Sequence, residues 1–174
     1  MNHVDHVNLI RGGVIPGVWA DFGSGAGAFT LALADLVGGD GEIFSIDRDA
    51  RALDQQRAAM RAQYPDRAVH YLTADFTRAL DLPLLDGVLM ANSLHFVRQK
   101  EPVLKLIHGY LKPGGSLIMV EYNGDRGNTW VPYPHSFETW GELAGKSGFK
   151  QTRMIGRHPS RFLNEIYGAL SIRV

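Results

Sequence analysis

A glycine-rich turn near the start of the chain has the residue types that let a ligand approach the main chain. It reads Asp21-Phe22-Gly23-Ser24-Gly25-Ala26-Gly27 and lies between a strand-like run and a segment of helical period. Because glycine has no Cβ, a ligand can reach the backbone N–H groups at the start of the helix. Gly23, Gly25 and Ala28 also fit the dinucleotide pattern G-x-G-x-x-G/A, so the turn alone predicts a nucleoside cofactor without choosing which one.

Three acidic residues at the ends of successive strand-like runs narrow this choice. Asp21 precedes the first glycine, where its charge would repel a pyrophosphate but attract an α-ammonium or sulfonium group. Asp47 is suited to accept hydrogen bonds from ribose hydroxyls. Asp75 can accept from an exocyclic amine while Phe76 lies against a purine. Each acid alone also fits a solvated turn or a helix cap, but open α/β sheets bind ligands at the edge that all three share.

The elements that must position these residues alternate between short apolar runs and longer segments of helical period. This alternation predicts an α/β fold with a parallel sheet. The expected strands span residues 17–22, 42–47, 68–72, 87–91 and 116–122. The expected helices follow the glycine turn, run from near Asp49 to Tyr64, start near Glu101, and run from Ser136 to about Lys146. Two final strand-like runs, 149–156 and 165–173, favour an antiparallel hairpin because only a short connection separates them.

The composition excludes several classes of function. The 174 residues suit one compact domain, and 18 basic residues balance 18 acidic ones, which gives no electrostatic reason to expect nucleic acid or an anionic membrane surface. The chain has no cysteine, which excludes disulfides, thiolate catalysis and cysteine-bound metals. The first residues lack the pattern of a signal peptide, and no apolar stretch is long enough to span a bilayer, so we expect a cytoplasmic protein.

Further motifs complete a pattern that resembles a known family. After the glycine turn come Ser45-Ile46-Asp47, Ala74-Asp75-Phe76, the run from Asp86 to His95, and Leu111-Lys112-Pro113-Gly114-Gly115-Ser116. In this order they resemble a class I SAM-dependent methyltransferase from about Val18 to Tyr122, and the Lys112–Gly115 turn best separates the chain from dehydrogenases. The resemblance implies a Rossmann-like, doubly wound sheet of about seven strands, mostly parallel with an antiparallel C-terminal hairpin, in a single domain over residues 1–174.

The resemblance also implies S-adenosyl-L-methionine (SAM) as the cofactor and assigns roles by position. The glycine turn would hold the methionyl part, Asp47 the ribose, and Asp75 with Phe76 the adenine, while Ala91 and Asn92 would flank the transferred methyl. The full set of expected cofactor-binding residues is Asp21, Phe22, Gly23, Ser24, Gly25, Gly27, Asp47, Arg48, Asp75, Phe76, Ala91 and Asn92. No metal site is expected.

Two departures from the family pattern bear on the substrate. Ser24 stands where many members have cysteine, which leaves backbone contacts unchanged. The Asn-Pro-Pro-Tyr signature of amino-group methylation on adenine or glutamine is absent, and Asn92-Ser93-Leu94-His95 stands in its place. This absence argues against DNA-adenine and release-factor-type substrates. We expect a small-molecule acceptor and no nucleic-acid partner. A protein or RNA acceptor and a homodimer are left open, although charge neutrality gives no support to RNA.

Methyl transfer from a sulfonium mainly requires alignment for an in-line displacement and exclusion of water. A hydroxyl or protonated amine acceptor also needs a general base, and His95, just after the fourth strand, is the best-placed candidate. The alternative is that His95 only packs against or caps the following turn. The residues expected to line an acceptor pocket, or else to pack, are Glu121, Tyr122, Trp130, Tyr133, His135 and Trp140.

The first 15 residues are expected to form a helix that acts as a lid, with the segment from His6 to Ile10 closing over the cofactor. His3, Asp5 and His6 resemble half of a metal site, but no further ligands are in view. We expect the acceptor to be held by this segment and by residues 123–135, or by a partner subunit. Two other functions remain open: an NAD-linked oxidoreductase, and a non-catalytic SAM-binding sensor or partner subunit.

Overall fold

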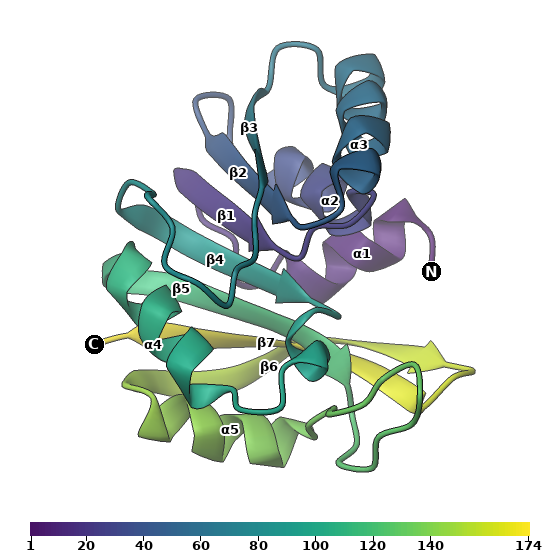
Figure 1. Cartoon of the computed structure of the whole chain (residues 1–174), viewed down its shortest axis with the longest axis vertical. Coiled ribbons are helices and arrows are strands. Elements are labelled where there is room, and N and C mark those ends of the chain that lie inside the picture. The colour runs from purple at the N-terminus through teal and green to yellow at the C-terminus, as the bar shows by residue number, and fades with distance from the viewer.

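A seven-stranded sheet with the strand order β3-β2-β1-β4-β5-β7-β6 forms the centre of the computed structural model, which describes residues 1–174 (Figure 1). The strands are β1 (Val18–Phe22), β2 (Glu42–Asp47), β3 (Ala68–Thr73), β4 (Leu85–Ala91), β5 (Leu111–Tyr122), β6 (Phe149–Ser160) and β7 (Asn164–Arg173). Only β7 runs against the others, because it pairs antiparallel with both β5 and β6. The predicted doubly wound sheet with an antiparallel C-terminal hairpin is confirmed.

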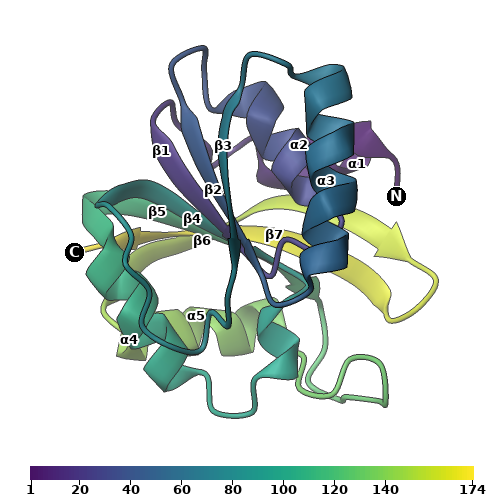
Figure 2. The same cartoon turned by 45° about the horizontal axis from the view of Figure 1, so that its top comes forward.

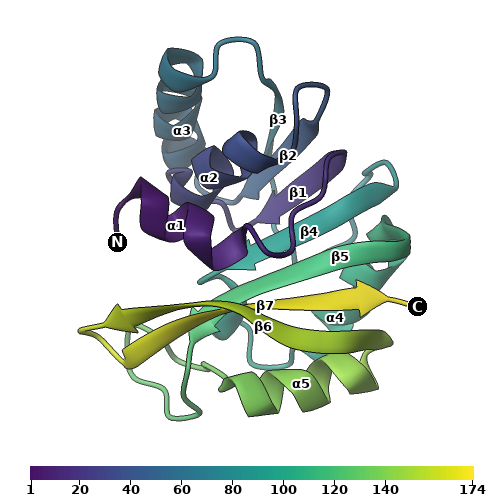
Figure 3. The ribbon, with the colours of Figure 1, turned by 180° about the vertical axis from the view of Figure 1, so that it is seen from behind.

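Helices cover both faces of this sheet (Figures 2 and 3). They are α1 (His3–Ile10), α2 (Ala28–Leu36), α3 (Ala50–Gln63), α4 (Glu101–Tyr110) and α5 (Phe137–Lys146). The period of two along the central strands divides the core between the faces. On β4, Val88 and Met90 pack with the cluster that includes α4 and α5, whereas Leu89 packs with the cluster that includes α1 and α2. None of the helices has both the length and the apolar character needed to cross a lipid bilayer.

Two strands are longer than the sequence pattern predicts. β5 begins at Leu111, which pairs with Leu85, and the register then shifts over the Lys112–Gly115 turn before regular pairing resumes at Ser116. β6 continues to Ser160 because Pro159 faces Glu165 in the hairpin. Proline is tolerated there because β6 lies at the edge of the sheet, where the missing N–H removes no ladder bond on the open side.

The connection from β3 to β4, residues 74–84, contains no helix. Leu80 and Leu82 pack against the core beside α4, and the main-chain N–H of Leu80 donates to the Tyr110 hydroxyl at 2.7 Å. The connection thereby covers the α4 side of the sheet and leaves Asp75 and Phe76 at the carboxyl edge.

Packing between β1 and β4 yields a test of the core. Gly87 faces the fully buried Trp19 across the two strands, and a Cβ added at Gly87 would overlap the indole ring. Gly87→Ala is therefore expected to lower the free energy of unfolding by about 2 kcal/mol or more, measured by urea denaturation.

The matched control is Gly141→Ala in α5, where nothing lies within 4 Å of an added Cβ. This change is expected to raise the free energy of unfolding by about 0.5–1 kcal/mol, because alanine loses less backbone entropy in a helix. Equal stability of the two variants would contradict the packing account.

Candidate functional site

The glycine turn is held to the end of β2 by main-chain hydrogen bonds. The N–H groups of Gly23 and Ser24 both donate to the carbonyl of Ile46, at 2.8 and 3.1 Å. Gly23, Gly25 and Gly27 have φ angles of 76°, 52° and 89°, a region that side chains with a Cβ rarely adopt. A Cβ added at Gly25 would have no neighbour within 4 Å, so this part of the turn faces open space.

A small polar cluster, which the sequence analysis did not identify, packs against Ser24 and Gly27 of the glycine turn. Ser45 Oγ lies 2.7 Å from Ser24 Oγ and 3.0 Å from Gln56 Oε1, and Gln56 is fully buried. A Cβ added at Gly27 would overlap the Gln56 side chain. The helical spacing of Gln56 from Leu53 and Met60 was the available signal, because it puts this polar side chain on the apolar face of its helix.

Asp21 lies at the end of β1 and is almost fully buried. The Thr30 hydroxyl donates to its Oδ2 at 2.6 Å. Burial raises the pKa of the Asp21 carboxyl to about 7, the negative charge of Asp47 adds to this shift, and the Thr30 bond opposes it. A buried carboxyl with one hydrogen bond is suited to meet a cationic ligand group.

The other two predicted acids are tied to the main chain near them. Asp47 accepts from the N–H of Gly25 at 2.8 Å through Oδ2 and from the N–H of Asp49 at 2.9 Å through Oδ1. Asp75 accepts from both the N–H and the hydroxyl of Thr77 through Oδ1, and these bonds hold its pKa below the ordinary value. Each carboxylate keeps lone pairs for a ligand.

Three hollows open along this edge of the sheet. The Asp75 hollow, of about 380 Å³, is lined by Gly23, Asp47, Arg48, Asp49, Ala74, Asp75, Phe76, Thr77, Asn92, Ser93, Phe96 and Val97. The Asp21 hollow, of about 280 Å³, is lined by Met1, His6, Asp21, Gly23, Ser24, Gly25, Ala26, Ala28, Phe29, Ala91 and Asn92. The His95 hollow, of about 420 Å³, is lined by Asn92, His95, Phe96, Tyr122, Trp130, Val131 and Phe162.

Asn92 is the residue that all three hollows share. Its φ of 52° is unusual for a residue other than glycine, and its N–H donates to the carbonyl of Val120 at 2.9 Å. Its side-chain Oδ1 is buried and has no hydrogen-bond partner. Strained backbone and an unpartnered buried oxygen are features that concentrate at ligand sites.

His95 forms a buried pair with Glu121, which lies on β5. His95 Nδ1 is 3.0 Å from Oε1 and 2.9 Å from Oε2 of Glu121, and the N–H of Tyr122 also donates to Oε1. Because a carboxylate only accepts, the ring proton lies on Nδ1, and Nε2 keeps its lone pair with no partner in the protein. This arrangement is that of a base held in orientation by an acid.

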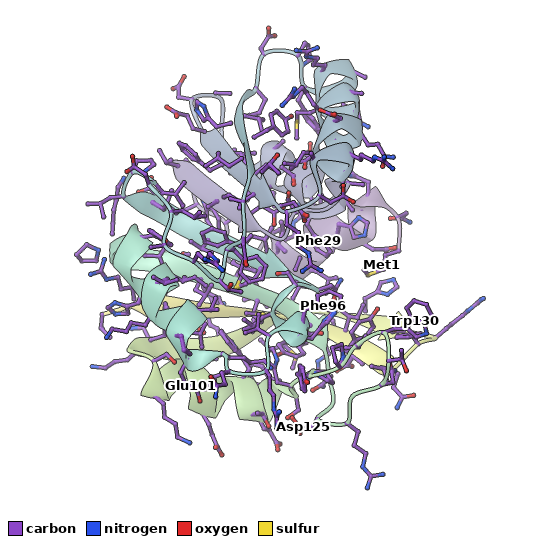
Figure 4. The ribbon with its side chains drawn as sticks, in the orientation of Figure 1. Met1, Phe29, Phe96, Glu101, Asp125 and Trp130 are labelled. Atoms are coloured by element: carbon purple, nitrogen blue, oxygen red, sulfur yellow. The ribbon has the colours of Figure 1, made fainter.

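Figure 4 shows Phe96 and Trp130 near each other at the His95 hollow, below Met1 and Phe29 of the Asp21 hollow. Tyr122, Val131 and Phe162 complete the apolar lining. The His95 hollow can therefore take a flat apolar molecule with one edge toward His95.

Four residues expected at an acceptor pocket lie elsewhere, and one of them is the fully buried Glu121 behind His95. Tyr133 lines none of the three hollows, and its N–H donates to the carbonyl of His95 at 3.0 Å. His135 and Trp140 lie in the interior, with ring centroids 5.5 Å apart. Burial lowers the pKa of His135 to about 3, helped by the positive charge of Lys100. The chain turns inward after Tyr133, so His135 and Trp140 do not line the pocket but pack in the interior, as the alternative in the sequence analysis allows.

Lys100, which no sequence pattern singles out, anchors this turn. Its Nζ donates to the carbonyls of Val97 and Tyr133 at 3.0 and 2.8 Å. Burial lowers the pKa of the Lys100 ammonium, and the charge of Glu121 opposes that shift. Lys100 therefore connects the segment that carries His95 to the loop that carries Trp130.

Among the expected cofactor-binding residues, the side chain of Phe22 lies in the core beside Phe76 and Tyr110 instead of in a hollow. Only its carbonyl takes part in the site, by accepting from the Ser93 hydroxyl at 2.7 Å.

Comparison with known proteins shows the family. A family described as "Methyltransferase domain" matches residues 20–115, more than half of the chain. The chain is 28% identical over 107 residues to the 2-phytyl-1,4-naphtoquinone methyltransferase of Nostoc punctiforme, with 59% of this chain and 45% of that protein covered. It is 31% identical over 105 residues to the ubiquinone/menaquinone biosynthesis C-methyltransferase UbiE of Pasteurella multocida, with 59% and 39% covered.

The chain thus spans less than half the length of these curated relatives. Its fold is similar to that of a SAM-dependent methyltransferase from Aquifex aeolicus, with a TM-score of 0.72 and 19% identity over 98% of this chain and 87% of that one. The family match, together with the order of motifs along the sheet edge, confirms the resemblance: the chain belongs to the methyltransferase domain family.

Proposed function

We propose that this protein transfers a methyl group from SAM to a small aromatic acceptor by in-line displacement. The observation that carries the proposal is the position of Asn92, where the two hollows suited to the halves of SAM meet the apolar hollow of His95. Asn92 also supports the presence of a ligand site here, because its side-chain Oδ1 is buried and has no hydrogen-bond partner in the protein.

In this proposal the two halves of the cofactor occupy the hollows that share Gly23 and Asn92. Asp47 accepts from the ribose hydroxyls in the Asp75 hollow, where Phe76 offers its ring to the adenine. Asp21 pairs with the α-ammonium group in the Asp21 hollow. This pairing favours the ionised form of the Asp21 carboxyl, which burial alone disfavours. When bound, SAM supplies a methyl group attached to a positively charged sulfur, and the neutral thioether that remains is a good leaving group.

His95 is the proposed general base. Its Nε2 takes the proton that the acceptor must lose, and Glu121 stabilises the imidazolium that results. Phe96, Tyr122 and Trp130 offer the acceptor an apolar surface beside His95.

The class of acceptor follows from the lining of the His95 hollow. The lining is mostly aromatic and contains no lysine or arginine, whereas nucleic acid requires cationic contacts to its phosphates. The relatives named as quinone methyltransferases support a flat ring as the acceptor. A proton-bearing aromatic compound, such as a phenol or a hydroquinone, matches both this lining and the base.

Cofactor choice is tested by thermal shift. S-adenosylhomocysteine (SAH) is expected to raise the unfolding temperature progressively with the logarithm of its concentration above Kd, equivalent to about 2.7 kcal/mol at 100 times its Kd, whereas NADH leaves it unchanged. Asp47→Ala is expected to weaken SAH binding by about 1–3 kcal/mol through lost ribose hydrogen bonds, and Asp40→Ala, in an exposed turn, serves as the control. Stabilisation by NADH in place of SAH would support the oxidoreductase alternative.

The Asp21→Asn variant is expected to change the stability of the fold and the affinity for SAH in opposite directions. Asparagine can still accept from Thr30 but has no charge to bury. Because the folded-state pKa of Asp21 is about 7 and its ordinary value is 3.8, the wild-type carboxyl destabilises the cofactor-free fold increasingly as the pH rises from about 4 to 7, and fully above 7. The variant is therefore expected to gain a few kcal/mol in free energy of unfolding at pH 8 and little at pH 4, while losing most of its affinity for SAH. A variant no more stable than wild type at pH 8 would refute the pKa assignment.

The base is tested with a panel of simple phenols and hydroquinones and SAM carrying a radioactive methyl group. His95→Ala is expected to slow methyl transfer by about 10²-fold or more and to leave the Kd for SAH unchanged. Glu121→Gln, which keeps the shape but loses the charge, is expected to have a smaller effect in the same direction. His70→Ala, on the far edge strand β3, is the matched control. Full activity of the His95 variant would remove it as the base.

A further inference from the structure

Helix α1 is fixed against the body of the protein, so the side chains that it presents to the Asp21 hollow have defined positions. His3 Nε2 lies 2.7 Å from Asp35 Oδ2 on α2, and His158 Nε2 lies 3.4 Å from Asp5 Oδ2. Leu9 and Ile10 are buried in the core. Of the segment from His6 to Ile10, only His6 lines the hollow.

Asp21 provides a partner for only one of the two charged groups at the amino-acid end of SAM. The amino-acid end of SAM carries one ammonium and one carboxylate, and Asp21 can serve only the ammonium. No lysine or arginine lines the hollow, and the Ser24 hydroxyl is engaged with Ser45. His6 is therefore the one side chain of the lining that can donate a hydrogen bond with a positive charge.

The surroundings of His6 leave its ring available. The imidazole packs against the Phe29 ring, with the ring centroids 4.7 Å apart, and makes no hydrogen bond within the protein. Burial lowers its pKa, as do the charges of the N-terminus, His3 and His158, while Asp5 acts in the opposite sense. A carboxylate beside the ring would offset these effects and favour a donating imidazole.

We infer that His6 binds the carboxylate of the cofactor's amino-acid end in the hollow that it lines together with Asp21. This inference rests on the proposed function, and it gives α1 a specific role: a rigid wall that selects a zwitterionic amino acid. His6 and Asp21 together would distinguish SAM and SAH from nucleosides that lack that group.

Two ligands that differ in this group alone provide the test. SAH and 5′-methylthioadenosine share the adenosine and the thioether, but the second has no amino-acid end. By isothermal titration calorimetry, His6→Ala is expected to weaken SAH binding about 10-fold or more and to change the Kd of 5′-methylthioadenosine less than twofold. His6→Gln, which keeps a donor, is expected to recover part of the loss.

Two control variants separate this role from a general loosening of α1. Val4→Ala alters an exposed side chain of the same helix, and His3→Ala removes the contact with Asp35. Both are expected to bind SAH within about twofold of wild type. Equal weakening of both ligands by His6→Ala, unchanged SAH binding, or an equal loss in His3→Ala would each overturn the inference. Failure of the wild-type protein to bind either ligand would instead refute the proposed function.

Discussion

The carbonyl oxygen of Ile46 accepts hydrogen bonds from the N–H groups of both Gly23 and Ser24, at the point where β2 ends. These bonds fix the glycine turn over the neighbouring strand, and the N–H groups of Gly25 and Gly27 hold it further by donating to Asp47 and to the carbonyl of Ser24. The bonds to Ile46 exist only because β1 and β2 run parallel and in a register that pairs Phe22 with Ile46. The direction of Asp21 and the start of α2 both depend on this contact.

Two buried carboxyl groups are a second feature of the site. Asp21 and Glu121 are both almost fully buried, and each has a specific partner: Thr30 for the first, His95 for the second. Buried charges destabilise a fold unless they are paired. A cationic ligand that pairs with such a carboxyl therefore removes part of this destabilisation. The cofactor-free protein is therefore less stable than its core alone would allow, and binding offsets that cost.

The sequence was sufficient to predict the parallel core and the residues at its edge. Apolar periodicity located the strands, and the rule that parallel strands share their carboxyl ends brought Asp21, Asp47 and Asp75 together. It could not reveal that Glu121 orients His95, because that contact depends on the register between β4 and β5, which the Lys112–Gly115 turn shifts. Nor could it place His135, whose burial results from hydrogen bonds that Tyr133 makes with His95 and Lys100.

The contact of α1 with the C-terminal hairpin bears on how the protein is made. Leu9 lies so close to Gly156 and Gly168 that a Cβ on either glycine would collide with its main chain. Part of the packing of α1 therefore forms only after β6 and β7 have been synthesised, whereas its contacts with α2, such as that of His3 with Asp35, can form earlier. Contacts of such long sequence separation as those with the hairpin form late and slowly. The helix that carries His6 is consequently locked in place by the last two strands of the sheet.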